Sequence, residues 1–157
     1  MSKKYKHILV PLDGSELAEL ALDDAFSLAE LSEAEVTLLQ VLPPIENIVH
    51  SDTDHPIYVD EQWANRRQMA LDYLNGVCER LMCGNLTIYK VVEMGQQPAA
   101  TIIDYAHEHP TIDIIVMATH GRSGLQRWVY GSVAGKVLRY AGVPTLLIRA
   151  HPDKQKK

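Results

Sequence analysis

The feature that most constrains this chain is a repeated order of segments. Short apolar runs without polar alternation are followed by stretches in which small or apolar residues recur at helical spacing. An apolar run of this kind is typical of a strand that is covered on both faces. When a helix follows each strand, it returns the chain to the end of the sheet at which the next strand begins, so the strands are parallel. The sequence therefore predicts an α/β fold.

Residue spacing places the individual elements. Strands are expected over residues 7–12, 36–42, 86–93, 112–117 and 145–148, and the run 86–93 alternates like a half-exposed edge strand. Helices are expected around residues 18–29, 60–82, 99–106 and 133–141. The stretch 45–58 has no clear period and is expected to be a long loop. At the first strand-to-helix turn, Asp13 and Glu16 have the spacing of a capping box, and Ser15 is a second candidate cap.

A loop that contains Gly121 and Gly124 joins the fourth strand to the last helix, which begins near Gly131-Ser132. Glycine lets the backbone approach a ligand closely, and the unpaired N–H groups and dipole of a helix N-terminus favour anions. Side chains that can add donors are Thr119, Arg122, Ser123 and Ser132. The stretch is therefore either a phosphate-binding loop or an ordinary surface turn before a capped helix.

Sheet topology decides whether this loop meets the turn at Asp13. In parallel α/β sheets, ligands bind at the carboxyl ends of the strands, at the point where the strand order reverses. If the first and fourth strands are neighbours, Asp13 and the loop from Gly121 to Ser132 flank one crevice.

Composition limits the class of protein. The 157 residues fit one globular domain, expected over residues 1–150 with a flexible polar tail over 151–157. The net charge of −5 argues against general nucleic-acid binding. No signal peptide is evident, and no apolar run approaches the roughly 20 residues that insert into a membrane. Cys78 and Cys83 point to different faces of one predicted helix and are expected to be reduced thiols in a cytoplasmic protein.

Taken in order, four segments resemble the universal stress protein family over essentially the whole chain. These segments are His7-Ile8-Leu9-Val10-Pro11-Leu12-Asp13-Gly14-Ser15, Met117-Ala118-Thr119-His120-Gly121-Arg122-Ser123-Gly124, Gly131-Ser132 and Val143-Pro144-Thr145-Leu146-Leu147-Ile148. The resemblance implies an open five-stranded parallel sheet of order 3-2-1-4-5, with helices on both faces, in a Rossmann-like fold of the adenine nucleotide alpha hydrolase type.

The resemblance further implies the ATP-binding subgroup. Its members carry Gly, two residues, Gly, nine residues, Gly, then Ser or Thr. Here Gly121 and Gly131-Ser132 match, while Ala118 replaces the first glycine. Alanine takes most backbone conformations except positive φ, so it fits if residue 118 is still part of the strand.

The resemblance implies a place for each part of the nucleotide. Pro11 and Val41 border adenine, Asp13 lies at the ribose or metal side, and Gly121, Gly131 and Ser132 hold the phosphates. Mg²⁺ or Mn²⁺ would be held mainly by phosphate oxygens, with Asp13 as a candidate protein ligand. The full set of expected ATP-binding residues is Pro11, Leu12, Asp13, Val41, Met117, Ala118, Thr119, His120, Gly121, Arg122, Gly124, Gly131, Ser132 and Val133.

The predicted function is that of a dimeric stress-response regulator or sensor for which ATP is a ligand that is hydrolysed slowly at most. His120 is the one candidate base near the loop, and it is interpreted as structural. The dimer would form through the last strand, Thr145–Ile148, and a regulatory protein partner of unknown identity is expected. Alternatives are a dimeric scaffold that binds no nucleotide, which Ala118 favours, and a weak ATPase. A dehydrogenase is disfavoured because no G-x-G-x-x-G follows the first strand.

Overall fold

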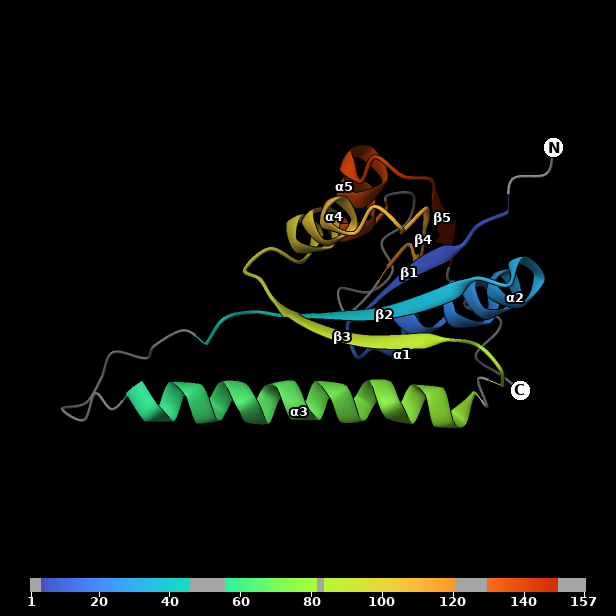
Figure 1. The fold of residues 1–157 in the computed structure, drawn as a ribbon. Helices are drawn as coiled ribbons and strands as arrows, with labels where there is room; N and C mark the ends of the chain where they lie inside the picture. The colour runs from blue at the N-terminus through green and yellow to red at the C-terminus, as the bar shows by residue number, and fades with distance from the viewer. Residues whose placement is uncertain (1–3, 46–55, 82–83, 121–129, 150–157) are drawn as a thin grey trace.

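The computed structural model describes residues 4–45, 56–81, 84–120 and 130–149, and its centre is a five-stranded parallel sheet (Figure 1). The strands are β1 (His7–Leu12), β2 (Glu35–Leu42), β3 (Ile88–Met94), β4 (Ile114–Ala118) and β5 (Thr145–Ile148). The helices are α1 (Glu16–Glu19), α2 (Leu22–Ser32), α3 (Pro56–Arg80), α4 (Pro98–Glu108) and α5 (Ser132–Tyr140). The strand order is β3-β2-β1-β4-β5, which confirms the predicted fold class and topology.

Two hydrophobic cores lie on opposite faces of the sheet. The first joins α1, α2 and α3 to one face of β1 and β2, where Ile8, Val10 and Leu38 are fully buried. The second joins α4 and α5 to the other face, around Leu9 and Leu39. Side chains on a strand alternate between faces, so a strand that is covered on both sides must be apolar at successive positions. This is the pattern from which β1 and β2 were predicted.

The first predicted helix is divided into α1 and α2 around Leu20 and Ala21. The N–H groups of these two residues bond to Leu17 and Ala18, three residues back, at 3.4 and 3.3 Å. This tighter spacing interrupts the α-helical ladder while the inward-facing alanines stay buried. The continuous helix predicted here is therefore wrong in this detail.

Other boundaries move by a few residues. α3 begins at Pro56, inside the stretch 45–58 that was expected to be a loop, and ends at Arg80. β4 begins at Ile114 because the N–H of Ile112 instead closes a turn onto the carbonyl of His109, at 2.9 Å. β3 is the edge strand that its alternation predicted.

Several predicted features lie outside the described residues. They are loop residues 46–55, Cys83, Gly121, Arg122, Ser123, Gly124 and the tail 151–157. Among the helices that are described, none is both long and apolar enough to cross a bilayer.

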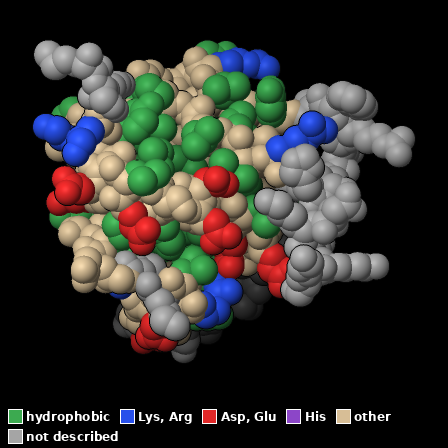
Figure 2. Space-filling view, turned by 90° about the vertical axis from the view of Figure 1, so that its right-hand side faces the viewer, with side chains coloured by type: hydrophobic (Ala, Val, Ile, Leu, Met, Phe, Trp, Pro, Cys, Tyr) green, Lys and Arg blue, Asp and Glu red, His purple; other side chains and the backbone are tan. Residues whose placement is uncertain are grey.

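The two ends of the strands face opposite sides of the molecule. In Figure 1 the strands run from right to left, so their carboxyl ends lie toward the overhanging end of α3. Figure 2 shows the side around the amino ends, where hydrophobic side chains gather in the upper middle of the view and acidic side chains lie across its middle and lower part. The candidate functional site is at the carboxyl ends.

Candidate functional site

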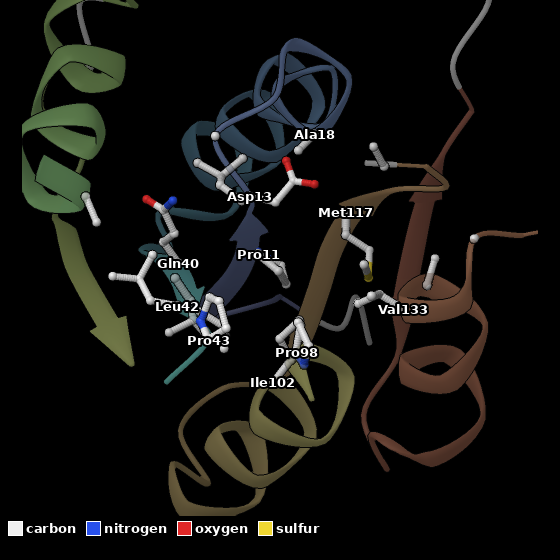
Figure 3. A pocket seen from close by; sticks show the side chains of 18 of the residues that line it. Pro11, Asp13, Ala18, Gln40, Leu42, Pro43, Pro98, Ile102, Met117 and Val133 are labelled. Carbon is white, nitrogen blue, oxygen red and sulfur yellow. The ribbon is translucent and has the colours of Figure 1, made fainter. Parts of the chain in front are cut away.

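A pocket of about 780 Å³ lies at the carboxyl ends of the strands (Figure 3). Its walls come from the ends of β1, β2 and β4, the first turn of α5, and parts of α3 and α4. β1 and β4 are neighbours in the sheet although β2 follows β1 in sequence, so the strand order reverses here. This is the position at which parallel α/β sheets bind ligands, and the volume is within the usual range of ligand pockets, about 300–1,000 Å³.

The pocket brings together the predicted site residues that the structure describes. Those that line it are Pro11, Leu12, Asp13, Val41, Met117, Ala118, Thr119, His120, Gly131, Ser132 and Val133. The remaining three, Gly121, Arg122 and Gly124, lie outside the described residues. Residues that are about a hundred positions apart in sequence therefore share one cavity, as expected if β1 and β4 are adjacent.

The turn between β1 and α1 is held by Asp13 and Ser15. The carboxylate oxygen Oδ1 of Asp13 accepts the backbone N–H of Ser15 at 2.9 Å and the Ser15 hydroxyl at 2.5 Å. Ser15 Oγ in turn accepts the N–H of Ala18 at 3.2 Å and is the N-cap of α1. The capping box that was considered between Asp13 and Glu16 is therefore wrong, because Ser15 occupies the cap. Asp13 holds this turn at the edge of the pocket, and Gly14 takes the positive φ of 82° that the turn needs.

The N-terminus of α5 points into the pocket. Its first three residues, Ser132, Val133 and Ala134, line the cavity, and the N-cap residue Gly131 has no side chain to bond their N–H groups. The first N–H groups of a helix have no carbonyl partner within the helix, and the helix dipole adds positive potential there. The arrangement can therefore bind an anion.

Gly131 fixes this helix against the end of β4. Its N–H donates to the carbonyl of Thr119 at 2.9 Å, while the N–H of Thr119 donates to Ile148 on β5 at 2.9 Å. A Cβ on Gly131 would lie 2.9 Å from that same Thr119 oxygen. The φ of Gly131 is −54°, so close approach, not backbone conformation, is what requires glycine here.

Ala118 and His120 flank Thr119 at the end of β4. Ala118 is the last residue of the strand and pairs with Ile148. The backbone of Ala118 does not have a positive φ, so alanine fits at this position, where the family motif has glycine. His120 Nδ1 lies 3.0 Å from the hydroxyl of Thr119, so this side chain can orient the imidazole.

One side of the pocket is apolar. Met117 and Val133 meet Val41 and Ile102 there, within the core that α4 and α5 make with the sheet. Figure 3 shows Pro11 between this group and the side of the pocket that faces α3. A flat apolar ring fits this side better than a charged group.

The α3 side of the pocket was not predicted. Arg66, Met69 and Tyr73 line it from α3, where a spacing of three and four residues puts them on one face of the helix. Gln40 lines it from β2. The sequence held one signal for it: Thr37 and Gln40 are two polar residues within the buried run of β2, and a polar residue in such a run needs a partner. Thr37 has one in the imidazole of His7, at 2.8 Å.

α3 is fastened to α1 beside the pocket. The Tyr73 hydroxyl donates to Glu19 Oε1 at 2.9 Å, and Arg80 pairs with Glu19 Oε2 at 3.0 Å. Burial raises the pKa of Tyr73 well above its usual value of 10, and the hydrogen bond to Glu19 raises it further. Tyr73 therefore stays protonated and remains a donor at any physiological pH.

The described residues provide no protein cage for a metal. Among them, no cluster of three or more His, Cys, Asp or Glu side chains is placed to hold an ion. Asp13 is the carboxylate among the described residues that line the pocket, and its Oδ1 accepts two hydrogen bonds from Ser15. The described residues that line the pocket therefore offer a metal one carboxylate.

Comparison with known proteins identifies what this chain resembles. A family model described as the universal stress protein family matches residues 4–149. A protein of Staphylococcus aureus (strain USA300) that carries the name universal stress protein is 28% identical over 146 residues, which are 92% of this chain and 84% of that protein. The solved structure of universal stress protein UspA from Lactobacillus plantarum is 26% identical, with a TM-score of 0.78, and the match covers 94% of this chain and 100% of that one.

Two further solved structures with this fold contain nucleotides. One is a universal stress protein in complex with cAMP, with a TM-score of 0.66 and 22% identity, covering 95% of this chain and 100% of that one. The other is an Arabidopsis thaliana protein of the family with AMP bound, with a TM-score of 0.56 and 16% identity, covering 95% and 94% of the two chains. At these identities the likeness shows a shared fold.

Proposed function

Because the chain belongs to the universal stress protein family, we propose that its pocket binds ATP and that the protein is a dimeric, nucleotide-responsive regulator. One observation carries this proposal: the turn at Asp13, the end of β4 and the N-terminus of α5 line the same cavity. An apolar side next to an anion-binding helix end suits a molecule with a flat base and a phosphate chain. That relatives of the same fold are complexed with AMP and cAMP supports an adenine nucleotide in particular.

Each part of the nucleotide has a candidate place. The base would lie on the apolar side between Pro11, Val41 and Met117, and the ribose would lie beside Asp13. The phosphates would accept the N–H groups at the start of α5. The strand conformation of Ala118 favours this reading over a scaffold that binds no nucleotide, because the one departure from the family motif causes no conflict.

The metal would arrive with the nucleotide. Mg²⁺ keeps several waters and commonly binds through substrate phosphates and one or two carboxylates, so it does not need a cage of protein ligands. Asp13 is the described carboxylate that is near enough to the pocket to take part, while its Oδ1 keeps the α1 turn in place. When bound, the ion would neutralise phosphate charge, and Mn²⁺ could take the same place.

ATP binding is tested by thermal unfolding with and without Mg²⁺-ATP. At a hundredfold excess over Kd, binding stabilises the native state by about 2.7 kcal/mol, which raises the Tm of a chain of this size by roughly 5–10 °C. No rise in Tm at millimolar Mg²⁺-ATP would contradict the proposal.

Ser132→Asp tests the position of the phosphates. Ser132 is exposed at the first turn of α5, where a carboxylate suits the helix dipole, so the variant should fold at least as well as the wild type. It should lose most of the stabilisation by ATP because its charge repels the phosphates. Ser132→Asn is the uncharged control and should retain it. Gly131→Asp would be a poorer test, because its Cβ would meet the Thr119 carbonyl.

The open edge of β5 supports the homodimer. β5 is the last strand of the sheet, and the exposed Leu146 is part of it. Pro144 and Ile148 direct their carbonyls to β4, so the alternation of a strand turns the backbone groups of Thr145 and Leu147 to the open edge. The β5 strand of a second copy of the chain, related by a two-fold axis, would hydrogen-bond to these backbone groups in a closed interface.

Proline substitutions separate this pairing from folding. Leu147→Pro removes an N–H that faces the edge and should give a folded monomer, whereas Leu146→Pro removes an N–H that faces β4 and should destabilise the fold itself. Light scattering and circular dichroism measure the two effects. A wild-type protein that is monomeric at micromolar concentration would refute the dimer.

A further inference from the structure

The α3 side of the pocket holds a buried polar atom that has no partner. Gln40 is only 6% exposed, and its side-chain oxygen Oε1 accepts no hydrogen bond from any described residue. A buried amide oxygen without a partner destabilises a fold, so such groups are rare unless a bound molecule satisfies them. Gln40 lines the pocket, and Figure 3 shows its amide between α3 and the end of β1.

Within the one pocket, this region and the proposed nucleotide side lie over opposite faces of the sheet. Successive residues of β2 point to opposite faces, so Val41 belongs to the core with α4 and α5, whereas Leu42 belongs to the core with α3. Gln40 is two residues before Leu42, so its side chain lies on the same face of the sheet as Leu42. Met117 and Val133, which are expected to border adenine, belong to the core with α4 and α5.

The chemistry of the α3 side is specific. Its apolar walls are Leu42, Met69, Ala70 and the ring of Tyr73, whose hydroxyl is already bonded to Glu19. Arg66 adds a permanent positive charge at the wall, and no described carboxylate lies within ion-pair distance of it. An apolar cavity with one buried acceptor and one cation matches a small molecule that carries a donor and an anionic group.

We propose that the α3 side of the pocket is a second ligand subsite, which binds a small apolar organic anion with an N–H or O–H group that donates to Gln40. The α3 subsite is formed by Gln40, Leu42, Arg66, Met69, Ala70 and Tyr73. The ligand's donor satisfies Gln40 Oε1, its apolar body covers Leu42 and Tyr73, and its acidic group faces Arg66. The subsite is separate from the nucleotide side and does not require a bound nucleotide.

The probe is anilinonaphthalene sulfonate, a fluorescent molecule with an aromatic body, an N–H group and a sulfonate. Wild-type protein, without nucleotide, should bind it saturably. Arg66→Met and Gln40→Met keep the size and the apolar surface of the site. Arg66→Met should raise the dissociation constant of the probe by about tenfold or more, since a hydrogen bond to a charged group contributes on the order of 1.5–3 kcal/mol. Gln40→Met should raise it by about two- to tenfold, since a hydrogen bond between neutral groups contributes on the order of 0.5–1.5 kcal/mol. Arg67→Met is the matched control, because Arg67 is the next residue of α3, is exposed and does not line the pocket. The affinity of this variant for the probe should stay at the wild-type value.

A second readout tests the role of Gln40 independently of the probe. If its oxygen is a ligand group, Gln40→Met removes an unsatisfied buried acceptor and should raise the Tm of the free protein by about 2 °C or more while it weakens probe binding. A purely structural glutamine would give the opposite sign. A fall in Tm, or equal probe affinity in wild type, Gln40→Met and Arg66→Met, would overturn the proposal.

The separation of the two sides is tested with Mg²⁺-ATP. If the protein binds ATP, saturating nucleotide should leave the probe bound at the α3 subsite, and competitive displacement would overturn the proposed separation. The variant measurements are made without nucleotide. Failure of ATP binding would therefore refute the proposed function and leave the test of the α3 subsite intact.

Discussion

Replacing Gly131 with alanine tests how closely α5 approaches β4. The new Cβ would lie 2.9 Å from the carbonyl oxygen of Thr119 and 3.7 Å from the Cα of His120. Both are backbone atoms, and the Thr119 peptide is held by its hydrogen bond to Ile148 on β5. No side chain can rotate to relieve the contact, so α5 must move away from the strand.

Two opposing terms set the magnitude. The φ of −54° at Gly131 suits alanine, and replacing glycine at such a position stabilises a protein by about 0.4–1 kcal/mol through the unfolded chain. Overpacking a well-packed site destabilises by about 1–3 kcal/mol. The steric term is larger, so we expect a net loss of roughly 1–2 kcal/mol, which lowers the Tm by about 2–8 °C.

Gly135→Ala is the matched control in the same helix. Its nearest neighbour to a new Cβ is the Cβ of Tyr130, at 3.9 Å, which is an ordinary contact. Alanine is favoured over glycine in a helix interior by about 1 kcal/mol, so this variant should gain roughly 2–4 °C in Tm. The same substitution therefore has opposite signs at two positions four residues apart.

Thermal unfolding followed by circular dichroism measures both variants, and a titration with Mg²⁺-ATP follows. Gly131→Ala should also bind ATP more weakly than Gly135→Ala, because only the first moves the N–H groups at the start of α5. A Gly131→Ala protein that is as stable as the wild type would refute the close approach. Equal ATP affinity in the two variants would refute the role of the α5 N-terminus.

Three further predictions concern pH, the attachment of α3 and turnover. Burial lowers the pKa of His7 below its ordinary 6.5, by more than the nearby carboxylates raise it. The stability that His7 contributes is therefore present above pH 6.5 and is lost as the pH falls. His7→Gln should flatten the decline, below about pH 6.5, in the free energy of unfolding measured with urea. Tyr73→Phe should lower stability by about 1 kcal/mol or more, since it removes a partly buried bond to a carboxylate, whereas loss of the exposed Arg80 in Arg80→Met should change it by less than about 1 kcal/mol in chemical denaturation. Single-turnover assays should show ATP hydrolysis far below the typical enzyme turnover of about 10 s⁻¹, and turnover of several per second that is lost in His120→Ala would make the protein an ATPase.

The sequence alone determined the fold class and the end of the sheet at which the pocket lies. Apolar runs such as His7–Leu12 mark strands covered on both faces, and the helices between them leave a parallel sheet as the simple solution. The family motifs then implied the strand order. Once β1 and β4 are neighbours, Asp13 and Gly131 must lie at the same end of the sheet, so this part of the pocket followed from topology.

Tertiary structure decided the contacts that no local pattern encodes. The spacing around Gly131 resembles that of any helix start, yet its 2.9 Å approach to Thr119 depends on how α5 docks onto β4. The alanines at positions 18 to 29 keep one helical period, but the ladder is interrupted within it, because packing on the sheet sets the local hydrogen bonds. Such contacts join residues through space, and sequence spacing constrains them weakly.

The α3 wall is the clearest case of what only the structure provides. Gln40 was visible in the sequence as a polar residue in a buried run, but its lack of a partner depends on every group packed around it. Arg66 and Tyr73 belong to an amphipathic helix, and their place at the pocket depends on where α3 lies along the sheet. Hydrophobic periodicity determines which face of a helix turns inward; the position of that helix on the sheet is set by the packing of the whole core.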